Sequence, residues 1–284
     1  MENMILDLIP ESPEALHATT FMNAPSSSSS LRGVNKLPPD PDHAVYLQQW
    51  ANLYDANNYD KGLAAWCLRE SHRWAEAAFD TSQHFGRVVE VGAGTGVHLR
   101  YVHHRFDEYW MTDLHPPLLE KIATPSRTAE QGGGDTRQCG GTSFRLSGED
   151  RGQVWVARQD ATRLDFPDDH ADRLIATHVL EHLPRPHEVL REWVRVLKPG
   201  GVLTLVLPCD PGVAWRLGRY ALVRRKLMRT GFEYDYWMAR EHINPINVLV
   251  AFCRHYFASI NELWWPTRIP SMDANLFYIA HMRV

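Results

Sequence analysis

A glycine-rich turn directly after a short apolar run constrains the fold of this chain more than any other feature. The run Arg87–Val91 is valine-rich, and Gly92, Gly94 and Gly96 follow it in the letters EVGAGTGVHL. Glycine lets the backbone turn tightly from a strand into a helix and approach a ligand more closely than a side chain would permit. The run therefore predicts the first strand of an α/β sheet, with a ligand site at its carboxyl end.

Further apolar runs continue this alternation of strands and helices. Short runs that are rich in β-branched or aromatic residues and bounded by Gly, Asp or Pro predict four more strands, at residues 108–112, 153–157, 172–177 and 202–207. Between the last two, apolar residues recur on one helical face from Val189 to Leu197, and the letters KPGG end that helix. Such connections predict a parallel sheet covered on both faces. The runs INELWWP and NLFYIAHMRV are expected to extend it as final strands.

The chain is expected to form one domain with additions, since 284 residues with 44% hydrophobic content can bury one full core. Residues 1–42 contain the Ser- and Pro-rich stretches NAPSSSSSLRG and KLPPDPD and are expected to be a disordered tail. The domain is expected to span residues 43–284. Within it we expect two N-terminal helices (43–80), a Gly-rich surface loop (123–152) and a basic insertion (211–240).

Composition argues against several classes of protein. The formal net charge of -4 and the pI near 6.4 give no overall attraction for nucleic acid, so no nucleic-acid partner is expected. Cys67, Cys139, Cys209 and Cys253 form no C-x-x-C pair, which argues against a zinc ribbon, a redox dithiol or a secreted disulfide scaffold. The N-terminus lacks a signal-peptide pattern, and no stretch approaches the ~20 apolar residues of a membrane span. These features favour a cytoplasmic enzyme.

Acidic residues at the ends of the predicted strands indicate which ligand the glycine turn would bind. The spacing is G-x-G-x-G, not the G-x-G-x-x-G of dinucleotide sites, and Glu90 stands just before it. A carboxylate there disfavours a phosphate and favours a cation; S-adenosyl-L-methionine carries an ammonium and a sulfonium and no phosphate. Asp113 closes the second strand and Asp160 follows the third, where ligands of open α/β sheets bind. A tight loop would explain the glycines alone, and a helix cap would explain one Asp alone. The order of the glycine turn and the three acids along successive strands favours a nucleoside site.

Four segments form a series along the chain: VVEVGAGTGVHL, TDLH, RQDATRLDFPDDHADRLIATHVLEHLPRP and RVLKPGGVLTLVLP. Together they resemble the successive motifs of the class I S-adenosylmethionine-dependent methyltransferases. The similarity is to the small-molecule branch that includes the ubiquinone and menaquinone biosynthesis C-methyltransferases, and it covers about residues 86–208. This resemblance implies a Rossmann-like, doubly wound α/β sheet of seven strands, the last antiparallel, with helices on both faces.

The resemblance also implies how particular residues hold S-adenosyl-L-methionine. Glu90 would contact or orient the amino-acid end of this cofactor, and the loop from Gly92 to Gly96 would form the floor beneath it. Asp113 would hold the ribose hydroxyls, and Asp160 with the backbone of Ala161 would recognise the adenine. The expected cofactor-binding residues are Glu90, Gly92, Ala93, Gly94, Gly96, Asp113, Leu114, Asp160, Ala161 and His178.

The letters HVLEH, residues 178–182, can be interpreted in two ways. They match H-x-x-E-H, in which two histidines one helical turn apart bind zinc and the glutamate activates a water, as in a zinc hydrolase. That site would require a well-formed helix and a third ligand downstream, whereas Pro184 and Pro186 interrupt the segment. The letters also follow the fourth strand directly, so we expect no metal and expect His178 to line the methyl-donor pocket. For His182, packing and function remain equally open.

The expected reaction is methyl transfer to a small-molecule acceptor, with O-methylation of a metabolite, a saccharide or a lipid-linked intermediate favoured. Transfer from a sulfonium is an in-line displacement in which proximity supplies much of the rate. A weakly acidic hydroxyl also requires a base, for which His178, Glu181, Asp210 and His242 are candidates that the sequence does not separate. NAD(P)-dependent oxidoreduction is the enzymatic alternative on a similar sheet, but it predicts the G-x-G-x-x-G spacing that the chain lacks.

The basic segment 211–240 is open to three interpretations. Arginines and a lysine alternate there with apolar residues, and aromatic residues surround two acids in FEYDYWMAREH. A lid over the methyl donor would use its arginines to meet an anionic acceptor such as a phosphate or a carboxylate. The alternatives are a solvated helix over the core and a peripheral contact with an anionic membrane surface. The sequence does not indicate an oligomeric state.

Overall fold

The computed structural model describes residues 40–43, 45, 46, 48, 49, 62–123, 143–146 and 151–284. The chain divides into two compact units, residues 1–43 and 44–284. Nearly all of the expected tail, residues 1–42, lies outside the described residues. Of the first expected helix, residues 43, 45, 46, 48 and 49 are described and are helical.

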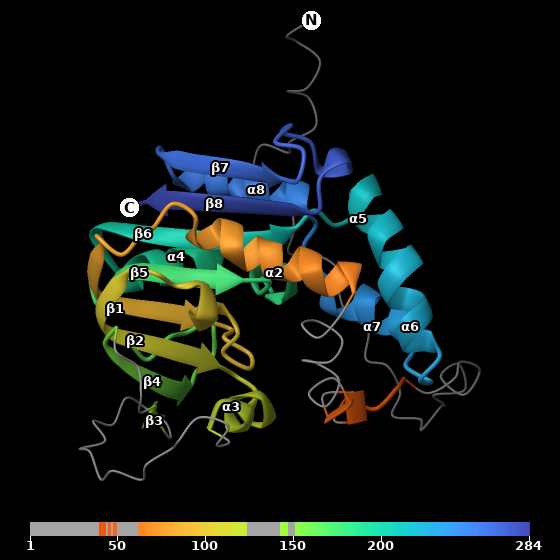
Figure 1. Ribbon diagram of the computed structural model, residues 1–284, viewed down its shortest axis with the longest axis horizontal. Coiled ribbons are helices and arrows are strands. Elements are labelled where there is room, and N and C mark those ends of the chain that lie inside the picture. Colours follow the sequence, from red (N-terminus) through yellow and green to blue (C-terminus); the bar gives the residue numbers. More distant parts are fainter. Residues whose placement is uncertain (1–39, 44, 47, 50–61, 124–142, 147–150) are drawn as a thin grey trace, which may run out of the picture. The chain divides into compact units, whose positions relative to one another are not determined.

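The second unit is built on one mixed sheet with the order β3-β4-β2-β1-β5-β6-β8-β7 (Figure 1). Its strands are β1 (His84–Val91), β2 (Arg105–Asp113), β3 (Ser143–Leu146), β4 (Gln153–Arg158), β5 (Ala171–Thr177), β6 (Leu197–Pro208), β7 (Ile260–Trp265) and β8 (Phe277–Arg283). The five central strands β4, β2, β1, β5 and β6 are parallel, and β8 lies antiparallel between β6 and β7. The predicted Rossmann-like sheet with an antiparallel last strand is confirmed.

Strand β3 is an addition to the expected seven strands. It falls inside residues 123–152, which the Gly-rich composition predicted to be a surface loop, and it pairs antiparallel with β4 from Ser143 opposite Ala157 to Leu146 opposite Val154. The prediction missed it because four residues are too short for a recognisable alternation of apolar and polar positions. Backbone pairing with the open edge of β4 provides the hydrogen bonds that form it.

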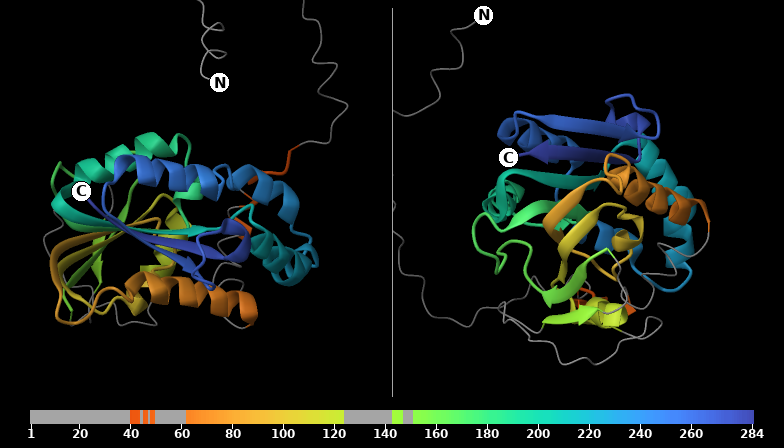
Figure 2. Two further views of the ribbon diagram at one scale, coloured as in Figure 1. Left: turned by 90° about the horizontal axis from the view of Figure 1, so that it is seen from above. Right: turned by 60° about the vertical axis from the view of Figure 1, so that its left-hand side comes forward.

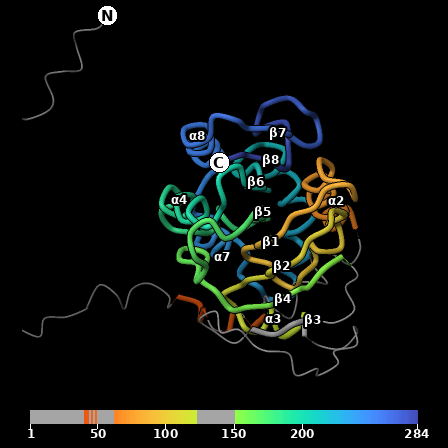
Figure 3. The backbone as a smooth tube through the Cα atoms, turned by 90° about the vertical axis from the view of Figure 1, so that its left-hand side faces the viewer, coloured from red at the N-terminus to blue at the C-terminus, as the bar shows by residue number. Residues whose placement is uncertain are grey.

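Helices cover both faces of the sheet, as predicted (Figures 2 and 3). Helices α4 and α8 lie on one face and α2 on the other, with the sheet between them. The α-helices are α2 (Leu63–Glu76), α3 (Pro116–Ala123), α4 (Pro186–Val196), α5 (Val213–Gly218), α6 (Arg225–Met228), α7 (Tyr234–Glu241) and α8 (Ile246–Tyr256). The shorter helical turns are the 3₁₀ elements η5 (His98–Tyr101), η6 (Leu180–His182) and η8 (Met272–Ala274), and the π-helix η7 (Arg219–Arg224).

The element after the glycine turn differs from the expected α-helix. It is the single 3₁₀ turn η5, because the chain re-enters the sheet at Arg105 and the short connection has no room for a longer helix. Helix α2, which precedes β1 in the sequence, contacts η5, β6 and β8 and so covers this face. Helix α2, which precedes the sheet in the sequence, thus covers the part of this face where a helix after β1 was expected.

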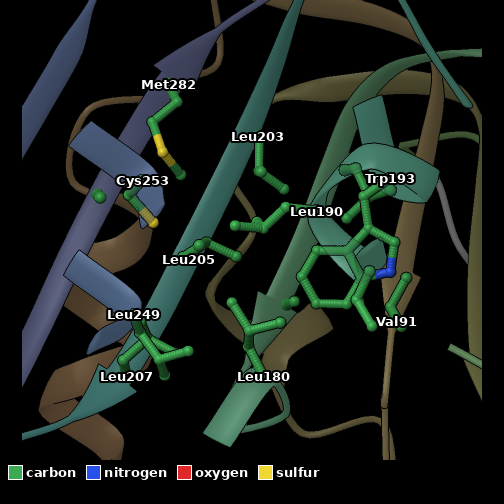
Figure 4. Close-up of a cluster of buried hydrophobic side chains, with 14 of the residues drawn as sticks. Val91, Leu180, Leu190, Trp193, Leu203, Leu205, Leu207, Leu249, Cys253 and Met282 are labelled. Carbon is green, nitrogen blue, oxygen red and sulfur yellow. The ribbon is translucent and has the colours of Figure 1, made fainter. Parts of the chain in front are cut away.

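The main hydrophobic core fills the space between the sheet and helices α4 and α8 (Figure 4). Full burial of one large apolar side chain contributes roughly 1.5–3 kcal/mol, so this cluster supplies much of the free energy that holds α4 and α8 to the sheet. Residues at its centre are Val91, Leu180, Leu190, Trp193, Leu203, Leu205, Leu207, Leu249, Cys253 and Met282. The apolar face predicted for α4 is confirmed, with Val189, Leu190, Trp193 and Val196 all buried.

A buried polar network attaches α2 to the opposite face. Arg173 of β5 donates two hydrogen bonds to the Glu76 carboxylate, at 2.8 and 2.7 Å, and His98 Nε2 lies 2.9 Å from the same carboxylate. Burial alone would raise the pKa of Glu76, but the Arg173 charge and the His98 contacts outweigh it and lower the pKa. The helix that borders the glycine turn is therefore held by charge as well as packing. No helix of the described residues is both long and apolar enough to cross a bilayer.

Candidate active site

The predicted site residues gather at the carboxyl edge of the parallel strands, the edge to which the arrowheads of β1, β2, β4 and β5 point in Figure 1. Glu90 lies in β1, Asp113 ends β2, Asp160 follows β4 and His178 follows β5. Parallel strands bring their carboxyl ends to one side, so residues far apart in the sequence meet there. The edge has two parts, named here after the roles proposed for them below: a donor half at β1, β2 and β4, and an acceptor half at β5, β6 and helices α5–α7.

The glycine turn closes the donor half against the end of β2. Gly92, Gly94 and Gly96 have φ angles of 67°, 55° and 73°, a left-handed backbone that favours glycine. The Gly94 N–H donates to Asp113 Oδ2 at 3.0 Å, which ties the turn to β2. A Cβ on Gly92 would lie 2.3 Å from a methyl carbon of Val179, so packing also requires glycine at this position.

Two buried carboxyl groups lie beside this turn. Glu90 is 1% exposed and accepts a hydrogen bond from the Tyr109 hydroxyl at 2.8 Å. Burial raises the pKa of Glu90, against the opposing effects of nearby His98 and of the Tyr109 bond. Asp113 is 7% exposed, and its Oδ1 accepts from the His115 N–H at 2.8 Å. Asp113 Oδ1 also lies 3.2 Å from Nδ1 of the partly exposed His115. Two buried acids at this turn favour a cationic ligand and disfavour a phosphate.

Asp160, Ala161 and Leu114 lie on the rim of the donor half. Asp160 is exposed, and its Oδ1 accepts from the backbone N–H and the hydroxyl of Thr162 at 2.8 and 2.7 Å. Asp160 thus stabilises a turn, and not the helix start that its sequence position also allowed. The Ala161 carbonyl accepts from Trp193 Nε1 at 2.8 Å, which fixes the backbone here, and Leu114 is 44% exposed.

His178 connects β5 to α2. It has a left-handed φ of 58°, and its Nε2 lies 3.1 Å from the Ser71 hydroxyl. Because Ser71 already donates to the Leu68 carbonyl at 2.7 Å, it accepts from His178, whose proton is therefore on Nε2. Burial lowers the pKa of His178 to about 3, so this imidazole is neutral and a poor proton acceptor at pH 7.

Glu181 and His182 extend the line of titratable groups from His178. Glu181 is 2% exposed, and burial raises its pKa to about 8, so it holds a proton at pH 7. His182 Nδ1 donates to the Glu241 carbonyl at 2.9 Å, while its Nε2 lies 3.7 Å from Glu181 Oε1. Burial lowers the pKa of His182 to about 3. Both groups are thus neutral at pH 7.

A pocket of about 370 Å³ opens at the end of β6, here called the β6 pocket. His242 Nδ1 and Arg219 Nη1 each lie 3.1 Å from Asp210 Oδ2, so one carboxylate joins an imidazole and a guanidinium. Burial alone would raise the pKa of Asp210, but the His242 hydrogen bond and the nearby charges of His242 and Arg219 outweigh it and lower the pKa. The lining residues are Asp210, Pro211, Arg219, Tyr220, Asp235, Met238, Ala239, His242, Asn244 and Pro245.

The two halves of the edge meet through His182. Its ring centroid lies 4.8 Å from that of His242, edge to face. The candidate residues therefore form one line from Asp210 and His242, past His182 and Glu181, to His178, whose Nδ1 is 4.0 Å from Glu181 Oε1. All four candidate bases belong to this line.

The segment HVLEH does not have the geometry of a zinc peptidase motif. His178 has a left-handed backbone and residues 180–182 form a 3₁₀ turn, so the two histidines are not on one face of an α-helix. In the described ranges, no three His, Cys, Asp or Glu side chains gather as a metal ion would require. The segment instead joins β5 to α4, as its place after the fourth strand suggested.

Sequence reasoning missed three residues that complete the site. Ser71 sets the tautomer of His178, and Tyr109 bonds Glu90. Asn244 donates from Nδ2 to the carbonyls of Leu180 and Leu183 at 3.0 and 2.7 Å, which fastens the pocket wall to η6. These contacts join residues 19 to 107 positions apart, so no local pattern could have pointed to them.

The comparisons agree with this architecture. A family model described as a methyltransferase domain matches residues 89–205, from β1 into β6, and so includes the glycine turn and the carboxyl ends of β1, β2, β4 and β5. The chain belongs to the class I S-adenosylmethionine-dependent methyltransferases. This methyltransferase is also similar in fold to a possible histamine N-methyltransferase from Thermotoga maritima, with a TM-score of 0.50 and 14% identity over 84% of this chain and 96% of that one.

Curated relatives match the methyltransferase over little more than half its length. A phosphatidylethanolamine N-methyltransferase from Cereibacter sphaeroides is 29% identical over 165 residues, which cover 56% of this chain and 69% of the relative. A chloroplastic 2-methyl-6-phytyl-1,4-hydroquinone methyltransferase from Oryza sativa subsp. japonica is 31% identical over 164 residues, covering 57% and 42%. The matched region spans less than half of the rice protein.

The donor half fits S-adenosylmethionine, the cofactor of this methyltransferase family. Its buried carboxyl groups suit the ammonium and sulfonium of that molecule, and the left-handed glycine turn leaves the backbone open to close approach. The acidic side chain directly before the turn, Glu90, disfavours the pyrophosphate of a dinucleotide.

Proposed function

We propose that this methyltransferase transfers a methyl group from S-adenosylmethionine to a hydroxyl oxygen of a small acceptor in the β6 pocket. The single observation that carries the proposal is the Asp210–His242 pair on the pocket wall, at 3.1 Å. A hydroxyl acceptor must lose its proton as it attacks, and an oriented imidazole is the usual group to take it. A carboxylate acceptor would require no such base.

On the donor side, we propose that the acids at the strand ends bind the polar parts of the cofactor. Glu90 takes the amino-acid end, Asp113 the ribose hydroxyls and Asp160 the adenine. Burial of the first two and exposure of Asp160 on the rim support this order, because the charged end then lies deepest. The full proposed set is Glu90, Gly92, Ala93, Gly94, Gly96, Asp113, Leu114, Asp160, Ala161 and His178.

Among the candidate bases, His242 is favoured by its surroundings. His178 and His182 each have a pKa lowered to about 3 by burial, and Glu181 keeps its proton at pH 7 because its pKa is raised to about 8. His242 instead donates from Nδ1 to the Asp210 carboxylate, which leaves Nε2 as proton acceptor and stabilises the imidazolium that forms. His178, Glu181 and His182, all neutral at pH 7, form the wall between the cofactor and the acceptor.

The chemical step follows from this arrangement. When bound, S-adenosylmethionine supplies a methyl carbon made electrophilic by its sulfonium. His242 would accept the hydroxyl proton at Nε2 as the acceptor oxygen takes the methyl group and the neutral thioether leaves. The product would be an ether, and His242 would hold the proton beside the Asp210 carboxylate.

The β6 pocket suits an acceptor that combines an apolar body with an anionic or hydroxyl-rich group. Tyr220, Met238 and Pro245 supply apolar wall, and Arg219 supplies a cation whose Nε has no hydrogen-bond partner within the described part of the chain. An acceptor anion would satisfy that N–H. The relatives named for phosphatidylethanolamine and for a phytyl hydroquinone support a lipid-linked acceptor over a free sugar.

A methyl-transfer screen with isotope-labelled donor tests the proposal. The acceptors are phenols, sugars, nucleotide sugars and lipid-linked hydroxyl compounds, each assayed with the wild type and with His242→Gln. Labelled product that is an ether, formed by the wild type and strongly reduced in the variant, is the expected result. A product methylated at carbon or nitrogen would contradict the O-methylation proposal, and so would full activity of His242→Gln on every accepted compound.

A further inference from the structure

The basic segment presents an unusual outer surface. Residues 213–228 run as one helical rod through α5, the π-helix η7 and α6, at the right of Figure 1. Its inner side packs on the domain: Leu227 is buried in a cluster with Phe232 and Trp237, and Trp215 packs against the main core. Its outer side exposes both apolar and cationic residues to solvent.

Large apolar side chains recur along that outer side. Val213, Leu217, Tyr220 and Met228 are 52%, 66%, 44% and 47% exposed. The first three follow one another at spacings of four and three residues, which place them on one face of a helix. A helix that only covered a core would carry polar residues at these positions. We call these four residues, with Arg216, Arg225, Lys226 and Arg229, the rod surface.

The charge on the rod surface has one sign. Residues 211–232 contain five arginines and one lysine and no acid, in a chain whose net charge is -4. Arg219 and Arg224 turn to the carboxylates of Asp210 and Asp235. The other four cations, Arg216, Arg225, Lys226 and Arg229, are exposed. Apolar and cationic side chains thus share one exposed helical surface.

We propose that the rod surface binds the face of an anionic lipid bilayer. Exposed apolar side chains set among cations are the composition of helices that lie in the membrane interface, with the apolar groups among the acyl chains and the cations at the headgroups. Each Lys or Arg near an anionic bilayer contributes attraction on the order of 1 kcal/mol. A nucleic-acid surface would use the cations and leave Val213, Leu217 and Met228 in water.

The rod surface also adjoins the acceptor pocket. Arg219 and Tyr220 of the same rod line the β6 pocket, and Tyr220 is in addition 44% exposed. A bilayer on the rod surface would therefore lie beside the wall through which a lipid-linked acceptor enters. This link to catalysis rests on the proposed function, whereas the binding of the bilayer does not.

Vesicle flotation of the full-length protein tests the proposal. The probes are vesicles of phosphatidylcholine alone and vesicles with about one third phosphatidylglycerol. Binding to the anionic vesicles only, with release at 0.5 M NaCl, is expected, because added salt shortens the reach of charge attraction. Equal binding to both vesicles, or binding to neither, would overturn the proposal.

Two pairs of variants assign the effect to the rod surface. Arg225→Gln with Arg229→Gln should lower partition onto anionic vesicles on the order of tenfold or more, and Leu217→Glu with Met228→Glu should abolish it. The matched controls are Arg100→Gln with Arg105→Gln, which removes two exposed cations elsewhere, and Val248→Glu on α8. Controls that lose binding as strongly as the rod variants would contradict the assignment.

Binding of S-adenosylhomocysteine, vesicle binding and methyl transfer together show whether the membrane proposal or the proposed reaction has failed. All variants should bind S-adenosylhomocysteine as the wild type does, which also shows that they are folded. If vesicles are bound and no hydroxyl acceptor is methylated, the membrane proposal stands and the proposed reaction falls. If a hydroxyl acceptor is methylated and anionic vesicles are never bound, the membrane proposal alone falls.

Discussion

The donor and acceptor halves of the carboxyl edge are built by different means. In the donor half, two paired strands set the geometry: Gly94 after β1 bonds Asp113 at the end of β2, and Asp113 bonds the N–H of His115, two residues on. In the acceptor half, Asp210 meets His242 from 32 residues away, across the helical rod. The donor half therefore follows from the pairing of β1 with β2, while the acceptor half depends on how one insertion packs.

The two halves also differ in their ionisable groups. The donor half contains the buried carboxyl groups of Glu90 and Asp113 and suits a cation. Beside the acceptor half lie His178 and His182, with pKa values lowered to about 3, a protonated Glu181 and the ion cluster at Asp210. A cofactor that carries positive charge and the proposed hydroxyl acceptor, which would lose a proton, call for such different environments. Changes in one half should therefore leave the other half's ligand almost undisturbed.

The largest expected effect is on turnover. His242→Gln should lower kcat by about 10²–10⁴-fold, the usual contribution of a positioned base, because glutamine cannot take the acceptor proton. Affinity for S-adenosylhomocysteine should stay unchanged. The measurement is steady-state methyl transfer with the acceptor found by the screen. His255→Gln, an exposed histidine on α8, is the matched control and should keep full activity; equal kcat for the two variants would remove His242 as the base.

The next effect concerns stability and pH. Burial raises the pKa of Glu181 to about 8, so between about pH 5 and pH 8 the folded chain holds a proton that the unfolded chain has lost. The unfolded state then binds fewer protons, and the free energy of unfolding falls as pH rises through this window. Glu181→Gln should remove that decline. Its free energy of unfolding relative to that of the wild type should therefore rise by up to about 4 kcal/mol between pH 5 and pH 8.

Denaturant unfolding at pH 5, 6, 7 and 8 measures this effect. Glu188→Gln on α4, where the carboxylate is 51% exposed, is the control and should run parallel to the wild type across the range. If the curve of Glu181→Gln also stays parallel to the wild type, Glu181 is not protonated in the folded state, and its place in the neutral wall between the halves is wrong.

A smaller effect is expected for the donor half. Asp113→Ala should weaken S-adenosylhomocysteine binding by about 10- to 100-fold, because hydrogen bonds to a charged group contribute roughly 1.5–3 kcal/mol. Acceptor Michaelis constants, measured at saturating donor, should not change. Asp107→Ala, on the same strand at its far end and 68% exposed, is the control. A loss of acceptor affinity in Asp113→Ala would break the separation of the halves.

The smallest effects concern the arginines of the rod. Arg219→Gln should raise the acceptor Michaelis constant about tenfold if a charged group of the acceptor meets it. Arg224→Gln should change this constant by less than about twofold, because its partner Asp235 is 49% exposed and exposed ion pairs are weak. The same acceptor titration measures both variants. A larger effect at Arg224 than at Arg219 would mean that the charged group of the acceptor meets Arg224 and not Arg219.

The sequence predicted where the acids of the donor half lie because each one stands beside the end of its own strand pattern. Glu90, Asp113 and Asp160 were therefore placed correctly at the strand ends. For the acceptor half, the sequence provided a set of candidate bases and no order among them. His178, Glu181 and His242 looked equivalent as letters, and only burial and the partners Ser71 and Asp210 distinguish them.

The same limit explains the errors in the fold. Strand β3 was missed because a four-residue strand is defined by its neighbour β4 and not by its own pattern. The helix expected after the glycine turn became the 3₁₀ turn η5 because the chain must reach Arg105 again, a constraint of length that periodicity does not reveal. Strand pairing decided the first, and the length of a connection decided the second.

One calorimetric series tests the central claim most directly: titration of S-adenosylhomocysteine into the wild type, Asp113→Ala and His242→Gln. The two residues lie on the same edge of the sheet, but only Asp113 belongs to the donor half. The division into halves predicts a loss of about 10- to 100-fold for Asp113→Ala and an unchanged affinity for His242→Gln. An unchanged affinity for Asp113→Ala, or equal losses for both variants, would contradict it.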